Sequence, residues 1–198
     1  MTTIRSFIAG LALGLPAAAF AQTPNLAAST YVGVQLGTGK VELNCRVNTP
    51  CSPVDTSYSV RAGYRFDASW AFEVKYTKID ADWGLFGSNY SAEFGGFGVG
   101  AAYSVPLSPS VGVVFRAGIS SNELKLQPAV VPFSQNPGTI TTRSIGPYAG
   151  LGASWQFARH WSVSLNADWT RADLRDAPTS AKQGATVRTL GAGIAFNF

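Results

Sequence analysis

The chain has 198 residues, enough for one domain, and a net charge of +4 that is spread along the sequence without a lysine or arginine run. This distribution argues against a nucleic-acid-binding protein. Apolar residues make up 46% and charged residues 13%, the latter about half the share of a soluble protein. Beyond the first residues, however, no apolar stretch is long enough for a membrane-spanning helix. Alternating strands that face lipid would account for this composition.

The N-terminus has the three parts of a secretory signal peptide. Arg5 supplies the positive charge, residues 7–15 form a short apolar run, and residues 19–21 read Ala-Phe-Ala, an A-x-A cleavage site. We therefore expect residues 1–21 to be a cleaved signal peptide and residues 22–198 to form the mature domain.

Two cysteines, Cys45 and Cys51, flank a short segment that contains Pro50. An exported chain meets an oxidising compartment, which favours a local disulfide between them over the alternative of free thiols. Two thiolates and a single distant histidine do not make the four ligands of a structural zinc site. We expect no metal and no cofactor.

Eight segments alternate between large apolar residues and small or polar ones, the period of a β-strand whose two faces meet different environments. From Tyr58 to Phe66, for example, the even positions are aromatic or aliphatic, and the odd positions include Arg61 and Arg65. The predicted strands, in chain order, are 31–36, 57–66, 70–77, 97–105, 111–120, 144–157, 161–170 and 190–198.

The connections between these strands alternate in length. Three are short, at 67–69, 106–110 and 158–160, and four are long, at about 45–56, 80–92, 121–142 and 172–185. An even strand count with short turns on one side and long loops on the other is typical of an outer-membrane barrel. The interior of an eight-stranded barrel is narrow and filled by side chains, so the face with glycines and charges must be the inner one.

The fold class predicted is therefore all-β: an eight-stranded antiparallel up-and-down transmembrane β-barrel in the bacterial outer membrane, with a periplasmic N-terminus and extracellular loops. Trp161 and Trp169 lie on one face, about 26 Å apart at ~3.3 Å per residue. With tilt this is close to the ~25 Å apolar band between aromatic girdles. The predicted girdle residues are Trp70, Trp155, Trp161, Trp169 and Phe198.

Two positions fit the alternation poorly. Pro147 lies inside a strand, where it removes a ladder hydrogen bond, so we expect a bulge or a late strand start there. The pair Gly95-Gly96 is expected to break the register, because Glu93 would otherwise face outward.

Several segments resemble a known family. Gly63–Asp67 (GYRFD) followed by Trp70–Tyr76 (WAFEVKY) resembles the second hairpin of the OmpA transmembrane domain and of opacity-type porins. Pro147–Gly152 (PYAGLG) resembles their sixth strand and that of the OmpW group, and Gly193–Phe198 (GIAFNF) resembles the C-terminal signal read by the barrel-assembly machinery. The resemblance implies a small eight-stranded barrel of the OmpA, OmpX and OmpW kind.

Charged residues inside the barrel are the first candidate site. If the short turn lies at 67–69, Glu73 pairs opposite Gly63 and Lys75 opposite Arg61. We interpret the set as a structural salt-bridge plug, with a gated ion path or a small polar site as the alternative. Its predicted members are Arg61, Arg65, Glu73, Lys75, Arg116 and Asp168.

His160 and Ser162 form a His-x-Ser pair that superficially resembles the motif of lipid A deacylases. In those enzymes the motif lies toward the outer leaflet, whereas His160 is placed here in a short periplasmic turn. We therefore expect no enzymatic activity and no catalytic residues.

The four long loops are the remaining candidates. The third, 121–142, contains the apolar residues Leu124, Leu126, Val130, Val131 and Phe133. Exposed apolar residues there would contact lipopolysaccharide, a host surface or another envelope protein; the alternative is that the strands extend above the membrane and the loop packs on itself.

The leading hypothesis is a non-enzymatic scaffold that presents four loops for adhesion or envelope interactions. A narrow porin-like or OmpW-like channel is the alternative, and a lipid A-modifying enzyme a distant one. The expected partners are lipopolysaccharide and membrane lipid, the barrel-assembly machinery through Phe198, and a host or envelope protein, but no nucleic acid.

Overall fold

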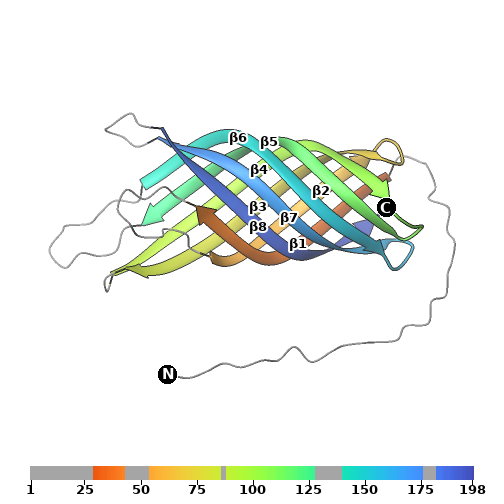
Figure 1. Cartoon of the computed structure of the whole chain (residues 1–198), viewed down its shortest axis with the longest axis horizontal. Helices are drawn as coiled ribbons and strands as arrows, with labels where there is room; N and C mark the ends of the chain where they lie inside the picture. The colour runs from red at the N-terminus through yellow and green to blue at the C-terminus, as the bar shows by residue number, and fades with distance from the viewer. Residues whose placement is uncertain (1–28, 43–53, 86–87, 128–139, 176–181) are drawn as a thin grey trace, which may run out of the picture.

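The computed structural model describes residues 29–42, 54–85, 88–127, 140–175 and 182–198. They form a closed antiparallel barrel in which each strand pairs with the next and β1 pairs with β8 (Figure 1). The eight strands are β1 Ser29–Glu42, β2 Val54–Arg65, β3 Trp70–Leu85, β4 Ser88–Pro106, β5 Val111–Gln127, β6 Ile140–Gln156, β7 Trp161–Arg175 and β8 Lys182–Asn197. The fold class expected from the alternation is confirmed. Among the residues described, no helix has the length and hydropathy needed to cross a bilayer.

The three short turns connect β2 to β3, β4 to β5 and β6 to β7, and they lie at the same end of the barrel as the C-terminus (Figure 1). Outer-membrane barrels have short periplasmic turns and longer extracellular loops, so we call this the periplasmic end and the opposite one the loop end. Asp67 stabilises the first turn, because its Oδ1 accepts hydrogen bonds from the backbone N–H groups of Ser69 and Trp70. The barrel closes because β1 pairs with β8; Val34 of β1, for example, is paired with Ile194 of β8.

The strands are longer at the loop end than the sequence indicated. The predicted loop 80–92 lies largely in strands, since β3 continues to Leu85 and β4 begins at Ser88, and the predicted loop 121–142 lies partly in strands, since β5 continues to Gln127. The predicted loops 45–56 and 172–185 are shortened in the same way, since β2 already begins at Val54 and β7 ends only at Arg175. The apolar alternation stops where the outward face becomes charged, but the backbone ladder does not depend on it and continues.

Of the two expected irregularities, the register break at Gly95-Gly96 is absent, and the disruption at Pro147 is present on one side of β6 only. The β3–β4 register runs without interruption through Gly95 and Gly96, so Glu93 does face outward, where lysines pair with it. The β5–β6 ladder likewise continues through Pro147, which is paired with Ile119. On its other side the regular β6–β7 pairing begins only at Tyr148, although β6 itself begins at Ile140 and β7 continues to Arg175. The ladder is therefore disrupted at Pro147 on this side, as its missing N–H predicts.

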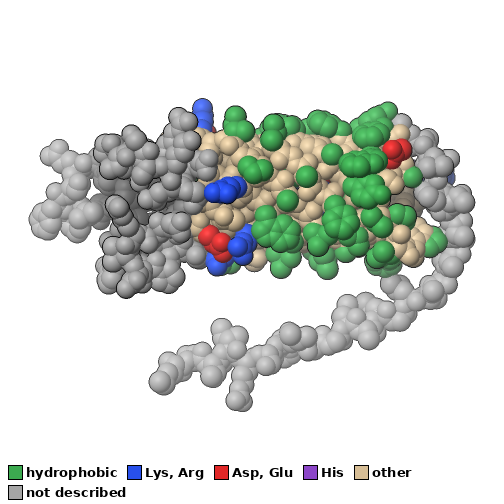
Figure 2. All heavy atoms as spheres, turned by 45° about the horizontal axis from the view of Figure 1, so that its top comes forward, with side chains coloured by type: hydrophobic (Ala, Val, Ile, Leu, Met, Phe, Trp, Pro, Cys, Tyr) green, Lys and Arg blue, Asp and Glu red, His purple; other side chains and the backbone are tan. Residues whose placement is uncertain are grey.

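The outward face carries a broad band of exposed aromatic and aliphatic side chains between the two ends (Figure 2). All five predicted girdle residues, Trp70, Trp155, Trp161, Trp169 and Phe198, are exposed. At the periplasmic end the rings pack on one another: Trp161 and Phe198 both contact Phe196 edge-on, with ring centroids 5.1 and 5.0 Å away. Amphipathic rings at the two water interfaces are the expected anchors of a transmembrane barrel.

Candidate functional site

Five charged side chains meet in the middle of the barrel interior. They project from the inward faces of β2, β3, β5 and β7, and they are Arg61, Glu73, Lys75, Arg116 and Asp168. We call them the charged layer. The β2–β3 register places Glu73 opposite Gly63 and Lys75 opposite Arg61, as the turn position predicted.

Ion pairs connect the layer across the barrel. Arg116 Nε lies 2.9 Å and Arg61 Nε 3.8 Å from Glu73 Oε2. Asp168 Oδ2 lies 3.1 Å from Lys75 Nζ and 3.5 Å from Arg61 Nη2. The two carboxylates are almost fully shielded from solvent, with Glu73 1% and Asp168 3% exposed. Three cations and two anions leave a formal excess of one positive charge within the layer.

Neutral groups add hydrogen bonds to the charged layer. The Tyr31 hydroxyl donates to Glu73 Oε1, and Arg116 Nη1 donates to Asn166 Oδ1 at 3.1 Å. Asn166 Nδ2 in turn donates to Ser164 Oγ at 2.8 Å. Sequence reasoning placed Tyr31 and Asn166 on inward faces but did not assign them to the site; a search for polar residues of inward parity would have found them.

Arg65, the sixth predicted member, lies apart from the layer, toward the periplasm. Its Nη1 donates to Asn197 Oδ1 at 3.0 Å, and its guanidinium lies 4.7 Å from the centroid of the Tyr31 ring. Within the described ranges, no ion pair of Arg65 to a carboxylate is found. Its positive charge, at the periplasmic end of the interior, is therefore not neutralised by a carboxylate of the described residues.

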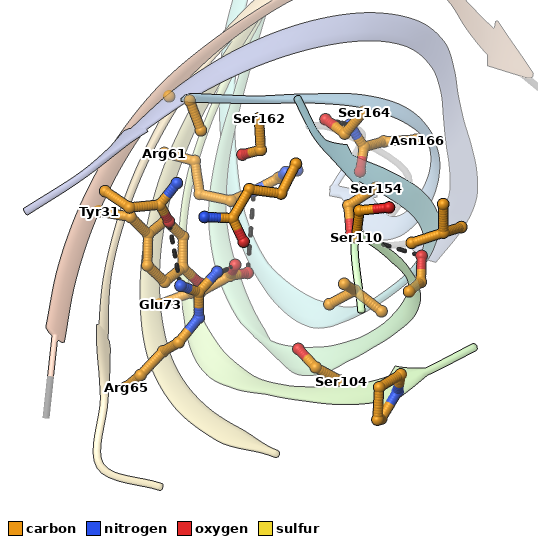
Figure 3. A pocket seen from close by; sticks show the side chains of 18 of the residues that line it. Tyr31, Arg61, Arg65, Glu73, Ser104, Ser110, Ser154, Ser162, Ser164 and Asn166 are labelled. Carbon is orange, nitrogen blue, oxygen red and sulfur yellow. Dashed lines mark hydrogen bonds and ion pairs between the residues drawn. The ribbon is translucent and has the colours of Figure 1, made fainter. Parts of the chain in front are cut away.

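Below the charged layer, the periplasmic half of the barrel contains a cavity of about 620 Å³. One wall is formed by β1–β3 and carries Tyr31, Arg61, Arg65 and Glu73 (Figure 3). The opposite wall, from β4–β7 and the β4–β5 turn, is lined by hydroxyl groups. They belong to Ser104, Ser110, Ser154, Ser162 and Ser164.

Above the charged layer the interior narrows to a void of about 10 Å³ that is bordered by Thr77, Asn122 and Tyr148. This is close to the smallest volume that holds one water molecule. The hydroxyls of Thr77 and Tyr148 and the amide of Asn122 have no hydrogen-bond partner in the described part of the chain. A water molecule in this void would form hydrogen bonds with some of these groups.

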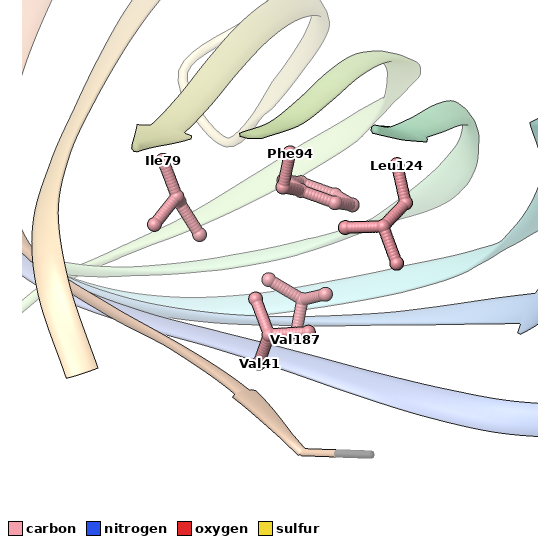
Figure 4. Close-up of a cluster of buried hydrophobic side chains, with 5 residues drawn as sticks. All are labelled: Val41, Ile79, Phe94, Leu124 and Val187. Atoms are coloured by element: carbon pink, nitrogen blue, oxygen red, sulfur yellow. The ribbon is translucent and has the colours of Figure 1, made fainter. Parts of the chain in front are cut away.

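At the loop end, five apolar side chains fill the barrel interior: Val41, Ile79, Phe94, Leu124 and Val187 (Figure 4). We call them the apolar plug. Of the two alternatives for the third loop, the extended strand holds at Leu124, because β5 continues past it and its side chain points inward and is buried, not exposed. Residues Val130, Val131 and Phe133 of that loop lie outside the described residues. Across the described interior, the charged layer and the apolar plug close the barrel at two successive heights.

The outward face of the loop end carries ion pairs across four strands, in the sequence Asp80–Lys78–Glu93–Lys125–Glu123–Arg143. We call this the charged rim; Figure 2 shows charged side chains gathered at this end of the apolar band. The shortest pair joins Arg143 Nε to Glu123 Oε2 at 2.7 Å, and this hydrogen bond lowers the pKa of Glu123. A second group on β1 and β8 joins Glu42 to Lys40 and Arg188, each at 3.2 Å.

His160 lies in the β6–β7 turn at the periplasmic end. Its Nδ1 is 2.8 Å from the backbone carbonyl oxygen of Asn197, and its ring stacks on Phe196. Ser162 lines the cavity instead. The two cysteines of the predicted disulfide, Cys45 and Cys51, lie outside the described residues. Among those described, no group of three or more His, Cys, Asp or Glu side chains could hold a metal ion.

Comparison with known proteins agrees with this architecture. The family described as "Outer membrane protein beta-barrel domain" matches residues 7–198. No curated protein sequence matches significantly. Among solved structures, Neisserial surface protein A is similar with a TM-score of 0.67 and 18% identity, covering 87% of this chain and 99% of that one. Ail, the attachment invasion locus protein of Yersinia pestis, has a TM-score of 0.56 and 13% identity (87% and 100% covered). OprG of Pseudomonas aeruginosa has a TM-score of 0.53 and 14% identity (86% and 96% covered).

Proposed function

The chain belongs to the outer membrane protein β-barrel domain family of bacteria, and we propose that its barrel is a non-enzymatic scaffold whose loop end contacts partners. The observation that carries this proposal is the closure of the described interior at two heights. The charged layer fills the middle of the barrel with ion-paired side chains, and the apolar plug excludes water above it. Function is then left to the loop end and its connections.

The extended strands support the same proposal. Because β5 continues to Gln127 and β6 begins at Ile140, the connection 128–139 starts well beyond the apolar band. It contains Val130, Val131 and Phe133, which suit an apolar contact with a partner surface. The likeness to Ail, solved in one structure with the heparin analogue sucrose octasulfate at 11% identity, shows the fold alone. The proposal of a partner therefore rests on the loops of this chain alone. The partner at these loops is a host or envelope protein, and lipopolysaccharide surrounds the charged rim.

Two other functions have less support. A channel would need a path through both the charged layer and the apolar plug. A lipid A deacylase would need His160 near the outer leaflet, whereas it packs against Phe196 at the periplasmic end. We also propose that Phe198, which directly follows β8, is read by the barrel-assembly machinery, and that Cys45 and Cys51 form a disulfide.

Loop exchange tests the scaffold proposal. Cells that display the full chain are compared with cells in which residues 128–139 are replaced by a Gly/Ser segment of equal length, using adhesion to epithelial cells and to immobilised matrix proteins. We expect adhesion to fall to the level of cells without the protein, while surface abundance and the heat-modifiable migration of the folded barrel are unchanged. Unchanged adhesion after exchange of each of the four connections in turn would contradict the proposal.

Conductance separates the scaffold from the channel. In planar bilayers we expect no regular single-channel openings from the full-length barrel. Steady openings that change in size when Arg116 or Glu73 is substituted would favour the channel.

Mass spectrometry of lipid A from expressing cells gives the corresponding test for an enzyme, with no mass change expected.

A further inference from the structure

The cavity in the periplasmic half of the barrel has two chemically different walls (Figure 3). The guanidinium groups of Arg61 and Arg65 lie on the β1–β3 wall, and Arg116 reaches into the lining from β5. Most of the serine hydroxyls lie on the opposite wall. Glu73 and Asp67 are the acidic side chains of the lining, so three cations face two anions. Asp67 is already engaged by two backbone N–H groups of its turn.

Two buried polar atoms at the cavity have no hydrogen-bond partner among the residues that the structure describes. The Oε1 atom of Gln35 is unpaired, although the residue is only 6% exposed. Arg61 Nε makes no hydrogen bond, and Glu73 Oε2 lies 3.8 Å away, too far for one. Arg61 is 8% exposed, and both residues line the cavity. An unsatisfied buried donor or acceptor is costly, so a bound group would gain by pairing with these atoms.

The free positive charge lies at the periplasmic opening. Arg65 has only the neutral partners Asn197 and Tyr31 within the described structure. A guanidinium pairs with a carboxylate or a phosphate through two parallel hydrogen bonds. Arg65 is thus placed to bind the anionic group of a molecule that enters from the periplasm.

We propose that this cavity is a binding site for a small polyhydroxylated anion, such as a sugar acid or a sugar phosphate. Arg65 binds the anionic group, and the serines of β4–β7 exchange hydrogen bonds with the hydroxyl groups. The volume of about 620 Å³ lies within the range of ~300–1,000 Å³ that small-molecule sites occupy. The charged layer forms the closed inner end, so the ligand enters and leaves on the periplasmic side. The site is independent of the loop-end function proposed above.

Calorimetric titration of the full-length barrel in neutral detergent micelles tests the site. The probes are glucuronate, glucose 6-phosphate and, as the neutral comparison, glucose. We expect saturable binding of at least one anion and none of glucose, and the tighter of the two anions identifies the carboxylate or the phosphate as the preferred group. Absence of saturable binding for both anions, or equal binding of glucose, would overturn the proposal.

Three variants locate the binding. Arg65→Gln removes the unpaired charge without breaking an ion pair, and we expect it to weaken anion binding by about tenfold or more, as the loss of a charged hydrogen-bond partner does. The double variant Ser104→Ala/Ser162→Ala tests the hydroxyl wall and should also weaken it. Lys78→Gln makes the same charge change on the outward face and should leave it unchanged. Equal weakening by Lys78→Gln, or no effect of the serine variant, would reject the two-walled site. Heat-modifiable migration of each variant verifies that it is folded.

Discussion

Glu73→Gln is the substitution that tests the charged layer most directly. The side chain keeps its shape and an acceptor oxygen, but it loses the negative charge that Arg116 Nε approaches to 2.9 Å and Arg61 Nε to 3.8 Å. Asp168 then remains as the one anion of the layer against three cations, so the formal excess rises from one positive charge to two.

The expected loss in the free energy of unfolding is large. Removing one partner of a buried ion pair costs roughly 3–5 kcal/mol, because an uncompensated charge is left in a low-dielectric site. We expect about 3 kcal/mol, the lower end of that range, since the single oxygen of glutamine still accepts the hydrogen bond from Arg116 Nε, and the Tyr31 hydroxyl can accept from the new amide N–H group where it donates to Glu73. Glu93→Gln is the matched control: it makes the same chemical change in the charged rim, where the side chain is 40% exposed, and an exposed pair contributes only ~0–1 kcal/mol.

Equilibrium unfolding in urea, with the barrel refolded into phospholipid vesicles, measures both variants. Tryptophan fluorescence reports the transition, because the girdle tryptophans leave the lipid on unfolding. A loss below about 1 kcal/mol for Glu73→Gln, no larger than that of an exposed pair, would refute the conclusion that the charged layer holds the interior together.

Three further predictions follow from the packing and the rim. Gly63→Ala should destabilise the barrel by about 1–3 kcal/mol in the same unfolding assay, because a Cβ there would overlap the Tyr31 ring; the double variant Gly63→Ala/Tyr31→Phe, which retains the ring, should not recover stability. Leu124→Ala should cost about 2–5 kcal/mol if the side chain fills the apolar plug, whereas a loop residue in water would change stability very little. The Glu123–Arg143 hydrogen bond lowers the pKa of Glu123 in the folded barrel. The hydrogen bond therefore contributes its full stabilisation of the folded state above the ordinary glutamate pKa of about 4.3. This contribution is lost as the pH falls through the lower pKa that Glu123 has in the folded barrel. The free energy of unfolding of the unchanged barrel and of Arg143→Gln is measured from pH 7 to pH 3. The difference between the two should shrink only at the acidic end, and a difference that shrinks near neutral pH would contradict this assignment.

The alternation of side chains was sufficient to predict the barrel and its two faces. Because the period of a strand is two, a single correctly placed turn at Asp67 determined that Glu73 lies opposite Gly63 and Lys75 opposite Arg61. The arrangement across the barrel could not be obtained in this way. Asp168 reaches Lys75 from a strand that is not its neighbour, and such a contact depends on the closed three-dimensional shape.

The loop end shows where the sequence rule failed. A polar interior holds for the charged layer, but Phe94 and Leu124 point inward and pack together at the loop end. There the outward face carries Glu93 and Lys125, so the two faces exchange character and apolar alternation no longer marks the lipid side. The cavity was also beyond prediction, because small inward residues such as Ser154 and Ser162 leave space only when no long side chain from across the barrel fills it.

The charged rim also fixes how deeply the barrel lies in the membrane. Sliding it toward the periplasm by two residues, about 5 Å of height for a tilted strand, would draw Lys78 and Lys125 toward the hydrocarbon, where a lysine costs up to ~2–4 kcal/mol at the midplane. Sliding it the other way would pull Trp70 and Trp161 out of their interface. The barrel is thus held at one depth, and the loop-end termini of β3–β6 stand at a constant height over the bilayer.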